Sequence, residues 1–189
     1  LLSFIAGNTQ LIAGRIDRAQ GLDDIAAAAR ELDGQVRLLR RQGVKLEALA
    51  EIVSDLNRRL HAKLYGLVAP DAIHDSACLI VMGSEGRGEQ TLRTDQDNGL
   101  ILREPVDPDT LDQFRRAFSG ALERFGFPPC PGNVMVVNPF WSKPLADYLS
   151  DFRRWISLPD EAAHMNMAIF YDAEAVAGDA RLLDEAKRQ

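Results

Sequence analysis

Apolar residues recur at three- and four-residue intervals through the first third of the chain, which is the spacing of one face of an α-helix. The stripe continues on both sides of Gly43 through Ile25, Leu32, Val36, Leu39, Leu46, Leu49, Val53, Leu56, Leu60 and Leu64. Residues 1–69 are therefore predicted to form a helical arm or connector. On the simplest interpretation these helices only pack: arginines such as Arg58 are solvated, and His61 lies at the surface or between helices.

After Pro70, short apolar runs alternate with helical patterns. The runs "ACLIVMG" (77–83) and "NGLIL" (98–102) predict buried strands, and "NVMVV" (133–137) and "AIFYD" (168–172) predict a third and a fourth. A helix is predicted to begin at Asp107-Pro108, a second after Pro144 and a third near the end of the sequence. The pattern predicts an α+β (mixed α/β) fold, in which residues 70–189 form a small mixed sheet with flanking helices.

Composition narrows the possible classes of protein. The 189 residues carry a net charge of −6, which argues against a dedicated nucleic-acid-binding surface. Cys78 and Cys130 have neither disulfide-framework nor zinc-site spacing, so a reducing cytoplasm is expected. No apolar run approaches the ~20 residues of a membrane span, and no signal peptide is evident. Because the sequence begins at Leu1 and ends in a charged helical pattern, we expect it to be a piece of a longer protein.

The stretch between the first two predicted strands, "GSEGRGEQTLRTDQD" (83–97), combines features suited to phosphate and metal. A turn at Gly83 and Ser84 can present backbone N–H groups and a hydroxyl to an anion, and Arg87 adds a fork of donors. In extended chain, Asp95 and Asp97 fall on one side, about 6.5 Å apart, where they can share one Mg²⁺ or bridge two. This chemistry suits phosphoryl transfer.

Each feature alone has a simpler interpretation, as a plain turn or a solvated loop. No Gly-Lys-Ser/Thr follows the first strand, so the stretch is not a Walker P-loop. Its ordered combination of strand, Gly-Ser, Asp-x-Asp and strand is more specific. We expect Asp95 and Asp97 to point into a cleft beside Gly83 and Ser84, with Asn98 and Glu89 bracing the motif, Glu89 through an ion pair with Arg87.

The stretch "GSEGRGEQTLRTDQDNGLIL" resembles the signature of the DNA polymerase β-like nucleotidyltransferase superfamily. More narrowly, it resembles the nucleotidyltransferase domain found with cyclic-nucleotide-binding and CBS domains in bacterial signalling proteins, which is related to the N-terminal part of PII-protein uridylyltransferase. The segments "CPGNVMVVNPFW", "WISLP" and "IFYDAEAVAGD" extend this resemblance over most of the chain.

The resemblance implies that Gly83 and Ser84 contact nucleotide phosphates and that Asp95 and Asp97 bind Mg²⁺ or Mn²⁺. A third carboxylate usually completes such a site; Asp172 is the candidate, although it could equally cap the last helix. In the related proteins, the segment that corresponds to "IFYDAEAVAGD" tends to carry an arginine at the position of Glu174.

The implied activity is transfer of a nucleoside monophosphate from an NTP to an acceptor, such as a regulatory protein, in a bacterial signalling protein that carries cyclic-nucleotide-binding or CBS domains. The alternative is a non-catalytic Mg-nucleotide sensor coupled to those domains. A third interpretation, a scaffold with a relic signature, is disfavoured by the intact Asp95 and Asp97 pair.

Overall fold

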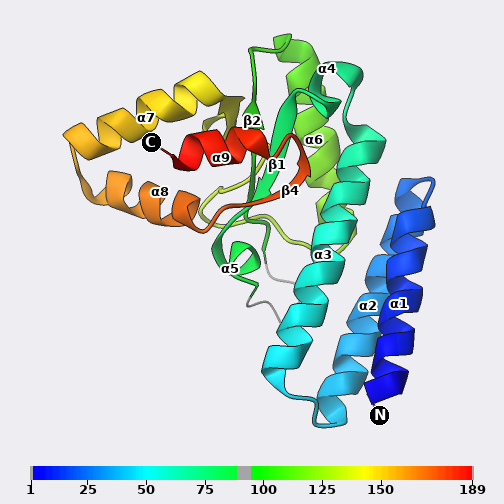
Figure 1. The fold of residues 1–189 in the computed structure, drawn as a ribbon. Helices are drawn as coiled ribbons and strands as arrows, with labels where there is room; N and C mark the ends of the chain where they lie inside the picture. The colour runs from blue at the N-terminus through cyan, green and yellow to red at the C-terminus, as the bar shows by residue number, and fades with distance from the viewer. Residues whose placement is uncertain (1, 89–94, 189) are drawn as a thin grey trace.

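The computed structural model describes residues 2–88 and 95–188, which form a four-stranded mixed sheet flanked by helices (Figure 1). The helices are α1 (Leu2–Arg18), α2 (Leu22–Arg41), α3 (Leu46–Val68), α4 (Asp71–His74), α5 (Gly83–Gly86), α6 (Pro108–Arg124), α7 (Leu145–Ser157), α8 (Glu161–Tyr171), α9 (Arg181–Lys187) and the 3-10 helix η1 (Pro139–Trp141). The strands are β1 (Ala77–Val81), β2 (Asn98–Leu102), β3 (Ser142–Pro144) and β4 (Glu174–Gly178). The predicted α+β fold class is confirmed.

The two central strands are buried along their whole length because helices cover both faces of the sheet. On one face, Leu79 of β1 and Leu100 of β2 pack into a core with α3 and α6. On the other face, Ile80 and Ile101 join a second core with α7, α8 and α9. Figure 1 shows these helices on the two sides of the central strands.

The N-terminal helices share a core with the sheet. Apolar residues of α1 and α2 pack against α3, and α3 also contacts α6 and β4. In Figure 1, α1 and α2 lie side by side along one half of α3, away from the sheet. The boundary between an arm (1–69) and a core (70–189) stays a prediction, but α3 links the two groups of helices physically.

Two predicted strands are wrong. Residues 133–137 form no strand, because their backbone does not join a strand ladder. Instead, the Val134 carbonyl oxygen accepts from the Asn98 N–H, and the Val136 N–H donates to the side-chain oxygen of Asn98. Residues 168–171 end α8, whose first turn is capped by the carboxylate of Asp160. The third and fourth strands are instead β3 and β4, which pair with β2 and β1 respectively.

Strand pairing brings three distant segments to one end of the sheet. The strand order is β3-β2-β1-β4, and β1 is antiparallel to both β2 and β4. Val81, the last residue of β1, is paired with Asn98 and Glu174, the first residues of β2 and β4. The segments that follow β1 and precede β2 and β4 therefore meet. We call this the α5 end of the sheet and the opposite one the α4 end.

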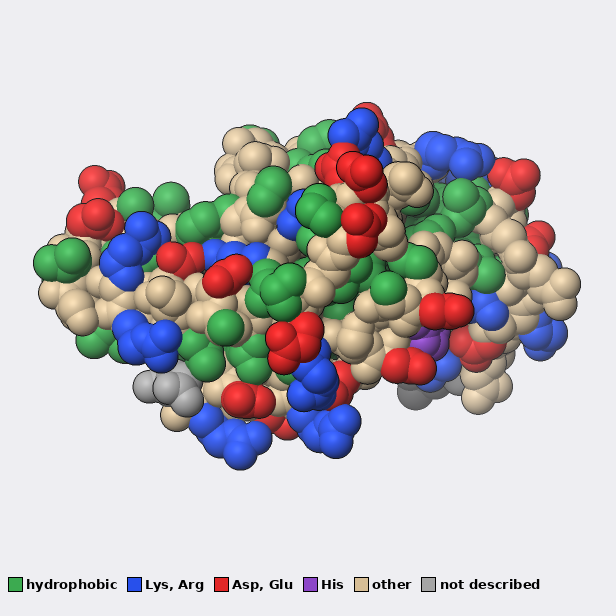
Figure 2. Space-filling model, turned by 90° about the horizontal axis from the view of Figure 1, so that it is seen from above, with side chains coloured by type: hydrophobic (Ala, Val, Ile, Leu, Met, Phe, Trp, Pro, Cys, Tyr) green, Lys and Arg blue, Asp and Glu red, His purple; other side chains and the backbone are tan. Residues whose placement is uncertain are grey.

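The surface carries mixed charge. On the face seen in Figure 2, acidic and basic side chains are interspersed with apolar ones. None of the helices in residues 2–88 and 95–188 is long and apolar enough to cross a membrane.

Candidate active site

The turn after β1 lies directly against Asp97. The N–H of Met82 donates to the carbonyl oxygen of Asp97 at 2.9 Å, which closes the two antiparallel strands at this end. Gly83 has a φ of 57°, in the left-handed region that favours glycine. A Cβ atom at Gly83 would lie 2.7 Å from Asp97 Oδ2, so only glycine lets the carboxylate approach the turn.

The residues before β2 alternate between buried and half-buried positions, as expected for extended chain. Gln96 and Asn98 are buried, and their backbone N–H groups donate to Pro128 and Val134. The Gln96 side chain is held as well, because its amide nitrogen donates to two backbone carbonyls. Asp95 and Asp97 are half-buried, and the structure brings their carboxylates together.

The chain from 128 to 136 adds a sulfur atom to this pair. It is held beside β2 by the hydrogen bonds just described and by the Val136 N–H, which donates to Asn98 Oδ1 at 2.8 Å. Asn98 thus braces the motif as expected, whereas Glu89 lies outside the described residues. Carboxylate oxygens of Asp95 and Asp97 and the Sγ atom of Cys130 all lie within 4.8 Å of one another. Sequence reasoning gave Cys130 no role, since the contact depends on a long-range fold.

The electrostatics of this cluster favour a bound cation. Burial raises the pKa of Asp97 to about 6, with further upward contributions from Asp95 and Glu85; the Cys130 thiol and Arg87 act in the opposite direction. Burial also raises the pKa of the Cys130 thiol. Neighbouring carboxylates repel each other when ionised, and a divalent cation removes that cost. The donor set and the glycine cradle beside Asp97 therefore fit a divalent metal.

A buried polar layer lies beneath the turn. Glu85 of α5 is 1% exposed and His61 of α3 is 0% exposed, and the distance from His61 Nδ1 to Glu85 Oε1 is 3.5 Å. Burial raises the pKa of Glu85, against the lowering effects of His61 and Arg58. Arg58 Nη2 donates to the carbonyl oxygen of Gly86 at 3.3 Å. The expectation that Arg58 is solvated is wrong, and His61 lies between helices.

Asp172 reaches the α5 end from another direction. It follows α8, and its carboxylate accepts a hydrogen bond from Arg87 Nη1 at 2.5 Å. A Cβ atom added at Gly86 would lie only 2.1 Å from the Asp172 carbonyl oxygen, so the backbones of these two residues are in close contact. Asp172 caps the C-terminus of α8 and is not at the start of the last helix. Among the described residues, the three-atom cluster of candidate metal ligands does not include it.

A cavity of about 690 Å³ opens beside Arg87 and Asp172, a size typical of small-molecule sites. Its apolar wall comes mainly from α7 and α8 and includes Phe152, Ile156, Met167, Phe170 and Tyr171. Glu174 and Lys187 add charged groups. The cavity therefore offers an aromatic and apolar surface next to the candidate phosphate-binding turn.

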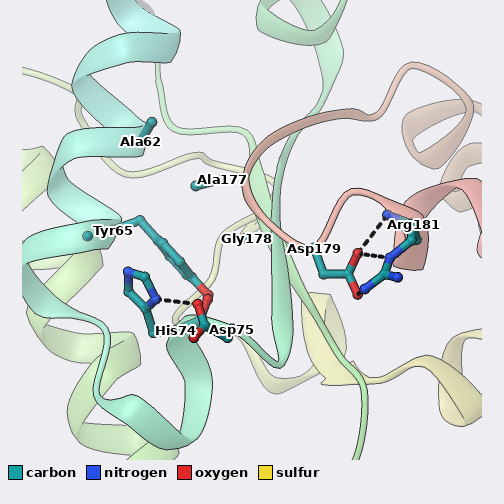
Figure 3. Close-up of a pocket in the computed structure, with 9 residues that line it drawn as sticks. Ala62, Tyr65, His74, Asp75, Ala177, Gly178, Asp179 and Arg181 are labelled. Atoms are coloured by element: carbon teal, nitrogen blue, oxygen red, sulfur yellow. Dashed lines mark hydrogen bonds and ion pairs between the residues drawn. The ribbon is translucent and has the colours of Figure 1, made fainter.

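The α4 end of the sheet holds a second, polar hollow of about 450 Å³ (Figure 3). Its side chains bind one another: the Tyr65 hydroxyl lies 2.9 Å from the Ile73 carbonyl oxygen, and His74 pairs with Asp75 at 2.7 Å. Asp179 pairs with Arg181 at 2.8 Å and also with Arg103. These contacts tie α3 to α4, and the end of β4 to α9 and to the end of β2, which is a structural role.

The Gly-Ser turn and the paired carboxylates, on a small mixed sheet with flanking helices, are the arrangement of a nucleotidyltransferase-type domain. The family model described as "Putative nucleotidyltransferase DUF294" matches residues 30–162, well over half of the chain. The chain therefore belongs to this family. The matched range includes the turn, both aspartates and Cys130, and ends before Asp172. Searches of curated proteins and of solved structures found no match.

Proposed function

We propose that this domain is a divalent-metal-dependent nucleotidyltransferase. It would transfer a nucleoside monophosphate from an NTP to an acceptor and release pyrophosphate. The observation that carries the proposal is the convergence of the Asp95 and Asp97 carboxylates, with Asp97 Oδ2 so near Gly83 that an added Cβ atom would lie 2.7 Å from it. A candidate metal site and a candidate phosphate-binding turn would thereby share one end of the sheet.

The residues divide between metal and phosphate. Asp95 and Asp97 would hold Mg²⁺ or Mn²⁺, while the turn at Gly83, the hydroxyl of Ser84 and the guanidinium of Arg87 would hold the triphosphate. When bound, the cation neutralises the phosphates and the charge that develops on the leaving pyrophosphate. Positioning these groups is most of what a protein must contribute to phosphoryl transfer.

We further propose that Asp172 serves the acceptor. An acceptor hydroxyl oxygen would attack the α-phosphorus, forming a new P–O bond while the bond to pyrophosphate breaks, and its proton would pass to the Asp172 carboxylate. The ion pair with Arg87 places that carboxylate between the turn and the large cavity. The cavity would hold the nucleoside or the acceptor. By resemblance, uridylylation of a regulatory protein, in a chain with cyclic-nucleotide-binding or CBS domains, is the reaction we favour.

A nucleotide sensor is the second candidate, and the contacts of α3 favour it. Arg58 and His61 reach the turn from α3, which also packs against α1 and α2. A change at the turn on nucleotide binding would thus act on the N-terminal helices. This function needs the same Mg-nucleotide site but no acceptor.

The test compares the wild-type protein with Asp95→Asn/Asp97→Asn and with a control, Glu104→Gln/Asp109→Asn, in which two exposed acids lose the same charge. Labelled NTPs and candidate acceptors measure transfer, and thermal unfolding measures binding. Nucleotide with Mg²⁺ at 100 times its Kd should stabilise the wild type and the control by about 2.7 kcal/mol.

In the aspartate variant this stabilisation should vanish, and transfer should fall about 10³-fold, equivalent to about 4 kcal/mol of lost transition-state stabilisation. An equal stabilisation in EDTA, or in the aspartate variant, would refute the metal-dependent site. Stabilisation of the wild type without any transfer would favour the sensor.

A further inference from the structure

The cluster beside Gly83 contains a thiol as well as two carboxylates, and this changes which metals it suits. Mg²⁺ binds oxygen ligands, whereas thiolates favour softer ions such as Zn²⁺ and Co²⁺. We propose that Asp95, Asp97 and Cys130 form a three-ligand site for a thiophilic divalent cation of the zinc class, with the fourth position open to water or phosphate. This inference rests on the metal-binding part of the proposed function, but not on nucleotidyl transfer.

The positions of the ligand atoms suit such an ion. Their mutual distances are within 4.8 Å. Around a tetrahedral Zn²⁺, with Zn–S near 2.3 Å and Zn–O near 2.1 Å, neighbouring ligand atoms are about 3.5 Å apart. Small side-chain rotations would therefore close the site without moving the backbone. Three protein ligands and one open position are typical of zinc sites that act on a substrate.

The backbone around Cys130 holds its sulfur toward the aspartates. Residues 130–133 form a tight turn in which the Asn133 N–H donates to the Cys130 carbonyl at 2.9 Å and Asn133 takes a φ of 55°. The N–H groups of Val134 and Gly132 hydrogen-bond to the sulfur, and the thiol bonds to the Asp97 carboxylate. Hydrogen bonds to a ligating atom fix its direction and tune its affinity for metal.

Charge beneath the turn adds an independent reason for a cation. Glu85 is 1% exposed, and neither of its carboxylate oxygens has a hydrogen-bond partner in the described part of the chain. It lies close enough to Asp97 to act on it electrostatically. Glu85 thus adds a third carboxylate to the surroundings of Asp95 and Asp97, and His61 and Arg58 lie near Glu85 rather than among the three ligand atoms.

The second cysteine supplies a matched control. Cys78 is 0% exposed within β1 and packs in the core with α7, α8 and α9. Its substitution changes the same functional group away from the cluster. Binding of a zinc-class ion to the proposed site would displace the Cys130 proton, which passes to solvent, and form a metal–sulfur bond.

The experiment titrates Co²⁺, and then competing Zn²⁺, into the metal-free protein without nucleotide. Wild type and Cys78→Ala should bind one ion per chain and show the intense near-ultraviolet absorption of a cobalt–thiolate bond. Cys130→Ala should lack that absorption and bind Zn²⁺ at least about 10- to 100-fold more weakly, since losing even an outer-sphere partner has that effect. Circular dichroism checks that each variant is folded.

The inference is overturned if wild type gives no cobalt–thiolate absorption, if the absorption persists in Cys130→Ala, or if Zn²⁺ affinity is unchanged in that variant. Stabilisation by nucleotide with Mg²⁺ is measured on the same samples. If wild type retains it but lacks the thiolate signal, only the zinc-class site fails. If the thiolate signal is present but Mg-nucleotide has no effect, the proposed function fails instead.

Discussion

Charged and polar side chains lie at both the α4 end and the α5 end of the same sheet, but the pKa values of the carboxylates shift in opposite directions at the two ends. At the α4 end, Asp179 is held between two arginines, which brings its pKa down to about 2. At the α5 end, burial and like charges raise the pKa of Asp97 to about 6. The first arrangement favours the ionised carboxylate and the second opposes it.

This difference separates stabilising from functional chemistry. Paired polar groups hold helices and strands together. A cluster of like charges instead lowers the stability of the ligand-free protein, and it serves a function only when a ligand binds to it. The α5 end also contains the buried Glu85, whose carboxylate has no hydrogen-bond partner in the described part of the chain and is therefore costly. We therefore expect substitutions at the α5 end to reduce binding or turnover, and substitutions at the α4 end to affect stability alone.

After the double aspartate variant, the largest effect on turnover should come from Asp172, the only acid of the α5 end that we propose acts on the acceptor. Asp172→Asn should leave the Kd for Mg-nucleotide within a few-fold of wild type but lower kcat about 10²-fold, the scale of a positioned general base. Asp109→Asn, which makes the same change at an exposed acid in the first turn of α6, is the control. Steady-state kinetics and titration calorimetry give the two quantities.

Because Asp172 is paired with Arg87, the substitution could act through the arginine alone. A double-mutant cycle with Arg87→Ala separates the two roles. We expect Asp172→Asn to lower kcat in the Arg87→Ala background as well. If it has no further effect there, Asp172 only positions Arg87, and the three-carboxylate mechanism is wrong.

An intermediate effect should follow from adding one methyl group at the turn. Gly83→Ala forces alanine to a φ of 57° and puts its Cβ 2.7 Å from Asp97 Oδ2. The strain should cost about 1–2 kcal/mol of unfolding free energy, and the displaced carboxylate should weaken Mg-nucleotide binding about tenfold.

Gly43→Ala is the matched control, since Gly43 has a φ of 76° with open space around it. It should cost a similar unfolding free energy while leaving the nucleotide Kd unchanged. Thermal unfolding and titration calorimetry on both variants give the comparison. Equal nucleotide affinity in the two variants would show that the contact between Gly83 and Asp97 has no part in binding.

Local patterns predicted the central parts of this fold well. Strands β1 and β2 follow from short, mainly apolar runs. The capped helix α6 follows from Asp107-Pro108, in which the Asp107 carboxylate accepts from the Thr110 N–H. The pattern for 133–137 failed because a buried apolar run looks alike in a strand and in a packed loop. The prediction of a strand at 168–172 failed because these residues end α8. That helix buries few residues, among them Ala163 and Phe170, and leaves Tyr171 81% exposed.

The candidate site likewise has residues that the sequence predicted and residues that it did not. Asp95, Asp97 and the Gly83 turn are close in sequence, and their geometry depends on one antiparallel pairing, so spacing alone located them. Cys130 and the contacts of α3 with α5 depend on how segments more than twenty residues apart pack. The only sequence signal for Cys130 was its place in "CPGNVMVVNPFW", a segment quoted for its resemblance and not for its chemistry.

The smallest effect is on the free energy of unfolding. Its dependence on pH tests the contrast between the two ends of the sheet. Asp97 has a native pKa of about 6, above its ordinary value of about 3.8, so the native protein holds the proton longer than the unfolded chain does. The free energy of unfolding therefore falls as pH rises between about 4 and 6, and the loss is complete above that window. Without metal, Asp97→Asn should be more stable than wild type by about 1–2 kcal/mol at neutral pH, and by almost nothing near pH 4.

Asp179 should behave in the opposite sense. Its native pKa of about 2 lies below the ordinary value, so its contribution to stability is present above about pH 4 and is lost as pH falls toward 2. Asp179→Asn should be less stable than wild type at neutral pH, by an amount that shrinks on acidification, with unchanged Mg-nucleotide affinity. Denaturant unfolding in EDTA from about pH 3 to 7 measures both variants. If the two stability differences changed with pH in the same direction, the contrast between a paired end and a ligand-binding end would not hold, because only carboxylates with oppositely shifted pKa values give slopes of opposite sign.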